Sequence, residues 1–410
     1  MLSEVPLGWQ QTTIANVASL NDESLSSKTP ADYDFRYVSI DDVSTGSING
    51  WTSLTFAEAP SRARRIARRG DILLSTVRPY LKSFTRVDGH DNDLVVSTGF
   101  AVLRAGAEIN PAYLYQLIFS EPFIEHLKEL MTGSNYPAVK PKDIAAFPFA
   151  LPPLNEQHRI AEILSSVDAS IQATQSVIEQ AERVKRGLMA ELLTGGLGSD
   201  AIERGEVPEG WALSPVSSVL KPSLFIDGDW VESKDQSPDG DVRLIQLADI
   251  GDGYFIDKSD RHLTKDTAMR LKCTFLRKGD ILVARMPEPL GRCCFFPLEG
   301  EECFVTVVDV AIMRPHESFN ATWLMNLINS DYARRFIEDN AGGTTRKRIS
   351  RKNLGGLLLP VPPIGEQCRI AEILSDLDSF ITKQKKTVEQ LTRTKRGLMD
   401  DLLTGKVRTV

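Results

Sequence analysis

Two arginine-rich segments are the part of this 410-residue sequence whose residue types could do chemistry. The first, between positions 61 and 86, holds one acid and eight basic residues: Arg62, Arg64, Arg65, Arg68, Arg69, Arg78, Lys82 and Arg86. The second holds no acid and five basic residues: Arg346, Lys347, Arg348, Arg351 and Lys352. Guanidinium groups neutralise DNA phosphates, and their planar fork fits guanine O6 and N7 in the major groove. A charge run is more often a solvated surface, but one run in each half of the chain favours DNA contact.

Two small polar segments, 133–136 and 343–346, lie 210 positions apart and just before further basic residues. They suit contact with DNA, because Asn can pair with adenine and main-chain amides can hold phosphates. Glycine and asparagine also simply form turns, so turns without a DNA contact are the alternative. The predicted contacts are Ser134, Asn135, Tyr136, Lys140, Lys142, Arg285, Thr344 and Thr345, together with the basic residues above apart from Arg86.

No motif for catalysis is found in the sequence. It lacks a GxxxxGK[ST] phosphate loop, a GxGxxG segment between strand and helix, an HExxH zinc motif and an Asn-Pro-Pro-aromatic methyltransferase motif. The five histidines are scattered and the five cysteines form no CxxC pair, so neither a metal site nor a catalytic triad is expected. We therefore expect a chain that is not an enzyme and holds no metal or cofactor of its own.

The composition is that of a globular protein, with 42% hydrophobic and 25% charged residues. The net charge is −7, so DNA contacts must come from local basic patches. The first residues do not form a signal segment, and the most apolar stretch, 144–154, is interrupted by three prolines. An odd number of cysteines fits reduced thiols. These features predict a cytoplasmic protein without a membrane segment.

A duplication with a period of 210 residues organises the chain. The segment PPLNEQHRIAEILS at 152–165 returns as PPIGEQCRIAEILS at 362–375, with eleven of fourteen positions identical. The same offset relates KRGLM at 185–189 to 395–399, and LLTG at 192–195 to 402–405. A period this long indicates a duplicated domain rather than a solenoid. Because the frame repeats while the loops differ, we expect the copies to bind two versions of one kind of target.

Heptad spacing predicts one long helix in each copy. The first series is Ile160, Leu164, Val167, Ile171, Thr174, Ile178, Ala181, Lys185, Leu188 and Leu192, and the second is Ile370, Leu374, Leu377, Ile381, Gln384, Val388, Leu391, Lys395, Leu398 and Leu402. Alternating steps of four and three form a coiled-coil seam. Asn155 is the expected N-cap of the first helix, Gly195 and Gly196 are expected to end that helix, and Gly405 is expected to end the second. About 38 residues make a rod of ~57 Å, longer than one ~34 Å turn of DNA.

The two seams are expected to pair with each other, and a pseudo-twofold repeat makes that pairing antiparallel; pairing with other molecules is the alternative.

Short apolar runs such as GDILLSTV and FAVLRA predict strands, and 111–131 and 320–340 predict helices. The expected fold is α+β: two globular domains (1–151 and 197–361) separated by two long antiparallel coiled-coil helices (152–196 and 362–410), with pseudo-twofold internal duplication. Helix residues beside the seam predict two equivalent docking surfaces: Glu156, Gln157, Arg159, Lys185 and Arg186, and Glu366, Gln367, Arg369, Lys395 and Arg396.

The LPP(L/I)xEQ-type segment, the RIAEIL helix and the KRGLM…LLTG exit, each present twice and in order, resemble type I restriction-modification specificity subunits. The resemblance covers the whole chain. It implies that the globular domains are target-recognition domains, each reading one half of a split asymmetric DNA site, with the helices as a spacer ruler. It also implies two modification subunits that bind S-adenosylmethionine and methylate adenine, and two restriction subunits that use ATP and Mg²⁺ to translocate and cut DNA.

Three other interpretations stay open at this point. The same architecture could serve a fused nuclease-methyltransferase of type II systems. A coiled-coil scaffold could bind protein instead of DNA, with the basic segments as solvated surface. An enzyme of unrecognised type is disfavoured because no constellation of catalytic residues is found.

Overall fold

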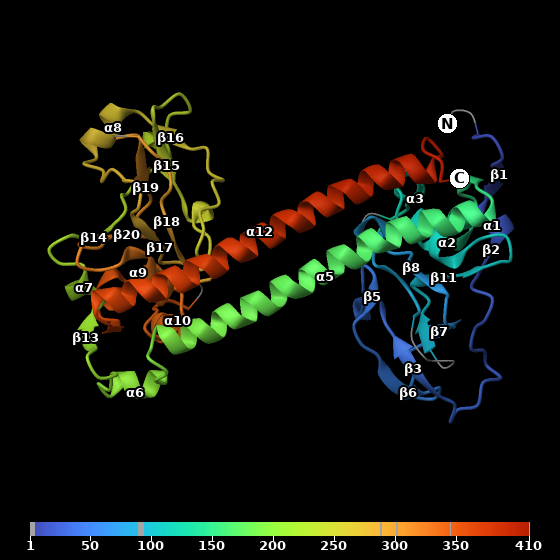
Figure 1. Ribbon diagram of the computed structural model, residues 1–410, viewed down its shortest axis with the longest axis horizontal. Coiled ribbons are helices and arrows are strands. Elements are labelled where there is room, and N and C mark those ends of the chain that lie inside the picture. Colours follow the sequence, from blue (N-terminus) through green and yellow to red (C-terminus); the bar gives the residue numbers. More distant parts are fainter. Residues whose placement is uncertain are drawn as a thin grey trace. The chain divides into compact units, whose positions relative to one another are not determined.

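The computed structural model describes residues 5–88, 94–133, 135–287, 289–300, 302–344 and 346–409. Two of the predicted DNA contacts, Ser134 and Thr345, lie outside these residues. The chain divides into two compact units, unit 1 (Met1–Gln175 and Lys386–Val410) and unit 2 (Ser176–Lys385), and each combines one globular domain with parts of both long helices (Figure 1). No helix in the described ranges is long and apolar enough to cross a membrane.

The globular part of unit 1 is an α+β domain with two four-stranded sheets. The first has the order β2 (Ala18–Leu20), β11 (Phe100–Ala105), β8 (Ile72–Ser75), β9 (Phe84–Arg86), and the second has the order β6 (Thr52–Thr55), β3 (Asp34–Val38), β10 (Leu94–Ser97), β7 (Ala63–Ala67). Two further strand pairs are β1 (Gln10–Thr13) with β12 (Pro148–Leu151), and β4 (Val43–Ser44) with β5 (Ser47–Ile48). The helical elements are α1 (Ile14–Val17), η1 (Ile40–Asp42), η2 (Pro79–Leu81), α2 (Pro111–Leu117), α3 (Glu121–Leu130) and α4 (Pro141–Ala145).

Strand β8 is apolar on both faces because both faces are covered. Ile72 and Leu74 pack in one cluster with residues of α2 and α3, whereas Leu73 packs in a second cluster with residues of β10. Successive side chains of a strand point to opposite faces, so a strand covered on both sides is a continuous apolar run in the sequence. The strands expected in GDILLSTV and FAVLRA are thereby confirmed.

The globular part of unit 2 repeats this plan. Its sheets have the orders β14 (Leu224–Asp227), β20 (Val310–Arg314), β17 (Ile281–Ala284), β18 (Cys293–Phe295), and β16 (His262–Leu263), β15 (Val242–Ile245), β19 (Phe304–Thr306), and β13 (Ala212–Pro215) pairs with β21 (Leu358–Val361). The helical elements are α6 (Ser199–Glu203), α7 (Val216–Val219), η3 (Ser233–Asp235), η4 (Leu247–Asp249), α8 (Lys265–Arg270), α9 (Ala321–Ile328), α10 (Asp331–Asp339) and α11 (Arg351–Gly355). In β17, Ile281 and Val283 pack toward the helices and Leu282 packs on the opposite face. The duplication is therefore structural as well as sequential.

The helices expected at 111–131 and 320–340 are each two helices, and this part of the prediction is wrong. Helix α2 ends at Leu117, and Ser120 then caps α3, because its hydroxyl accepts a hydrogen bond from the Phe123 N–H at 3.4 Å. Ser330 caps α10 in the same way, accepting from the Ala333 N–H at 3.3 Å. A serine cap inside an apolar run starts a new helix axis, which periodicity alone does not detect.

The two long helices are α5 (Leu154–Leu192) and α12 (Ile364–Leu403), and they run antiparallel within each unit. In unit 1, Ile160 near the start of α5 shares a core cluster with Leu402 near the end of α12. In unit 2, Leu188 near the end of α5 packs with Ile370 near the start of α12. The first helix begins two residues earlier than expected: it starts at Leu154, Asn155 is already helical, and the Pro153 carbonyl accepts from the Glu156 N–H at 2.9 Å.

Candidate nucleic-acid interface

Strand β7 divides the first arginine-rich segment into two groups. Arg62 precedes the strand, at the end of the domain where Thr98 N–H donates to its carbonyl oxygen. Arg68 and Arg69 follow the strand at its opposite end. Five residues of strand span about 16 Å, so these arginines do not form one patch, although they are neighbours in sequence.

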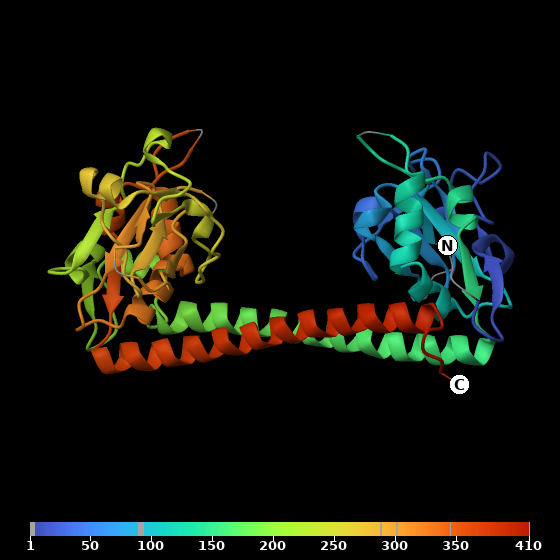
Figure 2. The same ribbon diagram turned by 90° about the horizontal axis from the view of Figure 1, so that it is seen from above.

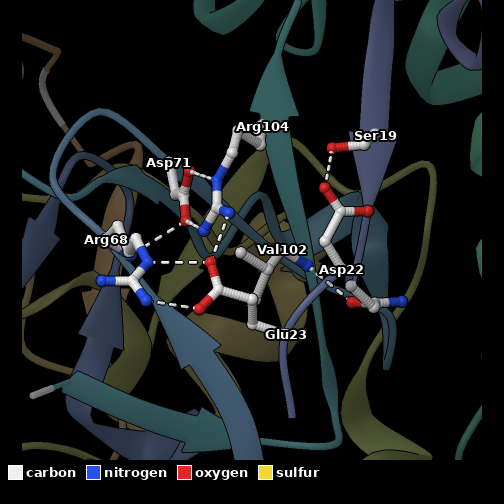
Figure 3. A network of polar contacts seen from close by, with 8 residues as sticks. Ser19, Asp22, Glu23, Arg68, Asp71, Val102 and Arg104 are labelled. Atoms are coloured by element: carbon white, nitrogen blue, oxygen red, sulfur yellow. Dashed lines mark hydrogen bonds and ion pairs between the residues drawn. The ribbon is translucent and has the colours of Figure 1, made fainter.

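Arg68 of this segment is neutralised inside the domain by a network of carboxylates and a second arginine, Arg104. Arg68 donates to Glu23 at 2.8 Å, and Arg104 binds both Glu23 and Asp71, as Figure 3 shows. These two guanidinium groups, Arg68 foremost, hold the pKa of Glu23 down at about 2. Unit 2 keeps the centre of this network, because Arg314 pairs with Asp280 at 2.6 Å. The network therefore stabilises the domain rather than offering positive charge to a ligand.

Three more arginines of the first segment have internal partners. Arg65 donates to the Asn21 side chain and the Phe100 carbonyl oxygen. Arg64 donates to the Ala63 carbonyl oxygen at 2.7 Å, and Arg86 pairs with Asp88 at 2.6 Å. Among the described residues, the exposed side chains of Arg62 and Arg69 have no hydrogen-bond or ion-pair partner. These two keep their charge available.

A projecting loop, described at residues 132, 133 and 135–138 (loop 1), lies beside the Arg62 end of this domain. Its base is closed by the Thr132 N–H, which donates to the Ala138 carbonyl oxygen at 3.0 Å, and by the reciprocal bond. The Arg78 N–H anchors the loop by donating to the Pro137 carbonyl oxygen at 2.8 Å. Tyr136 is 73% exposed. In Figure 2, loop 1 projects from the side of unit 1 that faces away from its long helices.

Arg78 joins loop 1 to the turn η2. Its guanidinium donates to the Asn135 carbonyl oxygen at 3.0 Å and lies over the Tyr136 ring, 5.3 Å from the ring centroid. Arg78 and Lys82 flank η2 with left-handed backbones, at φ of 47° and 55°. Non-glycine residues in this conformation are strained and cluster at functional sites. The turn exposes two side chains that were not predicted as DNA contacts, Tyr80 and Leu81. The segment RPYLK has no periodic pattern from which their exposure could be predicted.

The equivalent loop of unit 2 is described at residues 342–344 and 346–348 (loop 2). Gly342 and Arg348 close it with reciprocal main-chain bonds of 2.9 and 2.8 Å, and the Ile349 N–H donates to the Arg285 carbonyl oxygen at 3.1 Å. Arg348 pairs with Asp309 at 2.9 Å. Arg346 and Lys347 are exposed and have no side-chain partner within the described part of the chain. Loop 2 also projects away from the long helices of its own unit (Figure 2).

The remaining predicted contacts of unit 2 differ in their availability. Arg285 is buried beneath loop 2, where it pairs with Asp227 at 3.1 Å and donates to the Val308 carbonyl oxygen. Burial lowers the pKa of its guanidinium. Arg351 donates to the Phe225 carbonyl oxygen at 2.8 Å. Thr344 and Lys352 are exposed. Arg285 therefore supports the loop from below instead of facing solvent.

The lysines predicted in unit 1 surround the same domain. Lys140 and Lys142, at the start of α4, are exposed. Lys82 is half-buried and donates to the Phe119 carbonyl oxygen at 3.4 Å, and burial lowers its pKa. Lys82 lines a groove of about 1480 Å³ between the domain and α12, together with Lys395 and Arg396. It thus belongs to the groove rather than to loop 1.

The two domain–helix joints are built alike. The Trp9 indole donates to Glu156 at 2.9 Å in unit 1, and the Trp211 indole donates to Glu366 at 3.1 Å in unit 2. The side chains of Gln157 and Gln367 accept from the Asn110 and Asn320 N–H groups at 2.7 and 2.9 Å. Both glutamines are buried, and Glu156 is buried as well. These four predicted docking residues hold each domain on its helix.

The chain ends meet at the joint of unit 1. Arg408 pairs with Glu156 at 2.7 Å and donates to the Leu7 carbonyl oxygen at 2.8 Å. The bond from Arg408 is the largest of the interactions that lower the pKa of Glu156. Arg159 donates to the Thr409 carbonyl oxygen at 2.5 Å. Arg408 was not predicted, since nothing in its local sequence relates it to a residue 252 positions away.

The other predicted docking residues lie on or beside the helix seams. Lys395 pairs with Asp168 at 2.7 Å in unit 1, and Lys185 pairs with Asp378 at 2.6 Å in unit 2. Arg186, Arg369 and Arg396 are exposed and without a side-chain partner among the described residues. Lys185 and Arg186 line a groove of about 800 Å³ in unit 2 that corresponds to the groove of unit 1. Each unit therefore offers an equivalent groove edged by a basic pair.

Comparison with known proteins accounts for this duplicated arrangement. Residues 6–183 and 208–393 each match the family model described as "Type I restriction modification DNA specificity domain". The chain belongs to this specificity-subunit family. Specificity subunits are the non-catalytic, DNA-recognising members of type I restriction-modification complexes, which confirms the prediction of a DNA-binding chain that is not an enzyme. It also confirms the predicted internal duplication.

Individual relatives of this specificity subunit are distant in sequence. The MjaVIII specificity subunit of Methanocaldococcus jannaschii is 27% identical over 72% of this chain and 69% of its own length. The putative MjaX specificity subunit of the same organism is 25% identical over 99% of this chain and 95% of its own length. A chain in a solved structure of a type I restriction-modification system has a TM-score of 0.61 at 23% identity, over 99% of this chain and 100% of that chain. The last similarity concerns the fold alone.

Proposed function

We propose that the two domains of this specificity subunit read the two different halves of a split, asymmetric DNA site. The observation that carries the proposal is the pair of loops 1 and 2. They have the same main-chain closure at positions 210 apart, but their exposed side chains differ. Two loops with the same main-chain structure and different exposed side chains suit the recognition of two DNA half-sites that differ in base sequence.

The charge distribution supports DNA as the target. The chain has a net charge of −7, yet exposed basic side chains without partners among the described residues gather around each loop, Arg62 in unit 1 and Arg346 and Lys347 in unit 2. Phosphate contacts from such patches position the protein but carry no sequence information, so sequence must be read by contacts to the bases.

Partner subunits supply the chemistry in this proposal. Two modification subunits would dock at the two equivalent grooves edged by Lys185 and Arg186 and by Lys395 and Arg396, because a duplicated surface accommodates two copies of one partner. These subunits would bind S-adenosylmethionine and methylate adenine. Two restriction subunits, with ATP and Mg²⁺, would complete a complex that cuts unmethylated DNA. The lengths of α5 and α12 would set the spacing between the half-sites.

The test is a methylation map of DNA modified by the chain together with its modification subunit. We expect methylated adenines within one motif of two short specified halves and an unspecified spacer. An active complex that methylates a continuous motif, or that methylates without sequence preference, would contradict the proposal. The same complex lacking this chain is the control and should produce no motif.

A further inference from the structure

The tips of loops 1 and 2 place Tyr136 and Arg346 at equivalent positions. Gly133 and Gly343 have φ values of +100° and +98°, and a Cβ atom added to them would lie 3.2 Å from the Tyr136 carbonyl oxygen and 2.6 Å from the Arg346 carbonyl oxygen. The chain therefore folds back tightly on the residue three positions later in both loops. Only glycine permits this approach without a steric cost. The tight turn fixes the backbone of Tyr136 and of Arg346, and therefore the points at which their side chains leave the loops.

Tyr136 is held in place before any ligand binds. The Arg78 guanidinium covers one side of its ring at 5.3 Å from the centroid, and Arg78 is itself fixed by a bond to the Asn135 carbonyl oxygen at 3.0 Å. With 73% of the residue exposed, the rest of the ring is open. A rigid aromatic side chain gives contact area at little entropic cost. An aromatic ring that reaches the major groove meets the C5-methyl group of thymine as its apolar partner.

Arg346 presents the opposite chemistry from the same position. Its neighbour Arg348 is engaged by Asp309 at 2.9 Å and by the Val308 carbonyl oxygen at 3.5 Å, which anchors the base of loop 2. No described carboxylate pairs with Arg346, so its five donors remain available. A free guanidinium in the major groove pairs with guanine O6 and N7.

We propose that positions 136 and 346 are the base-reading positions of the two domains, with Tyr136 contacting a thymine methyl group in one half-site and Arg346 pairing with a guanine in the other. This inference rests on the proposed function and adds the class of base that each half must contain. Arg78 is a positioning residue for Tyr136. Lys347, beside Arg346 and equally exposed, contacts the phosphate backbone.

The experiment uses the complex of this chain with its modification subunits, and it begins with methylation maps of three variants. Arg346→Ala should make one guanine position degenerate in one half-site and leave the other half unchanged. Tyr136→Ala should relax one A·T position in the other half-site, whereas Tyr136→Phe should leave the motif unchanged. Affinity for the original site should fall roughly tenfold to a hundredfold for Arg346→Ala, which corresponds to losing one bidentate base contact.

A binding assay with chemically altered DNA separates base contact from other causes. Replacing the relevant thymine by deoxyuridine removes only the methyl group, so it should weaken wild-type binding and have little further effect on Tyr136→Ala. The matched control Lys347→Ala should weaken binding to all sequences alike and flatten the salt dependence, as expected of a phosphate contact.

The outcomes distinguish this inference from the proposed function. A wild-type complex without a two-part motif would overturn the proposed function itself. If the two-part motif exists but Tyr136→Ala and Arg346→Ala keep its bases, or weaken all sequences equally, the base-reading assignment is wrong. Melting curves of each variant show that the chain is folded, since both side chains project into solvent and their removal should not lower stability.

Discussion

Asp229 carries an unfavourable charge inside unit 2. Burial raises its pKa from 3.8 to about 6, although the Thr274 N–H donates to its carboxylate at 2.9 Å. A folded-state pKa above the unfolded value means that the protonated form is favoured by folding. The contribution of this group to stability is therefore full below pH 3.8 and is lost as the pH rises through about 6.

Replacing Asp229 by Asn should stabilise unit 2 at neutral pH. The amide oxygen can still accept from Thr274, while the buried charge is gone. Each unit of pKa shift corresponds to about 1.4 kcal/mol, and partial solvent access reduces the gain to about 1–2 kcal/mol. Denaturant unfolding at pH 8 and pH 5 checks this, because the gain should shrink at the lower pH. Equal stability of the two chains at pH 8 would show that the carboxylate is not penalised.

The roles of single arginines could not be sorted from the sequence. Arg68 and Arg69 are adjacent, yet only Arg68 meets Glu23, which lies 45 positions away. Arg285 follows an apolar strand, and the sequence predicts it as a DNA contact. In the structure, Asp227 and the carbonyl oxygens beneath loop 2 enclose its guanidinium. Charge density along the chain predicts where cations occur, whereas the tertiary fold decides which of them are neutralised. Loops 1 and 2 were predictable, because their glycines and their 210-residue offset are written in the sequence.

At the scale of elements, the seam lysines fix how the helices meet. The heptad pattern predicted both helices and their polar positions, since steps of four and three depend only on local sequence. It did not predict that Lys395 binds Asp168 or that Lys185 binds Asp378, because the register between two helices depends on both. An ion pair at a coiled-coil seam specifies register more than it adds stability.

Removing the two aspartates that pair with the seam lysines should have unequal effects. Asp168 accepts from Lys395 and also from Gln116 at 2.9 Å, which ties α2 to the helix pair. At the position of Gln116, unit 2 has the shorter Asn326, whose amide donates to the Thr322 carbonyl oxygen instead. We expect Asp168→Asn to cost ~0.5–1 kcal/mol more than Asp378→Asn, the range of a partly exposed polar contact. Unfolding curves of the two variants measure this. Equal losses in the free energy of unfolding would show that the Gln116 contact to Asp168 adds no stability.

At the scale of the whole molecule, the proposed ruler role of the long helices predicts that helix length sets the length of the DNA spacer. Adding seven residues to each helix between the central seam positions, at 171–181 and the corresponding 381–391, preserves both seams and lengthens each helix by about 10.5 Å. We expect a spacer longer by about three base pairs and unchanged half-sites. Methylation maps of the lengthened chain test this. A folded, active variant with the original spacer would exclude the helices as the ruler.

The likeness of the two domain–helix joints has a consequence for how such a protein can change. Each domain is fastened by a tryptophan on a glutamate and by a glutamine on a main-chain N–H, so a foreign domain with the same tryptophan and asparagine cap would fit either place. The stretches 152–165 and 362–375 are nearly identical in amino-acid sequence, so a domain joined at either stretch would precede the same helix start. Exchanging one domain in this way would change one half of the proposed DNA site and leave the two joints as they are.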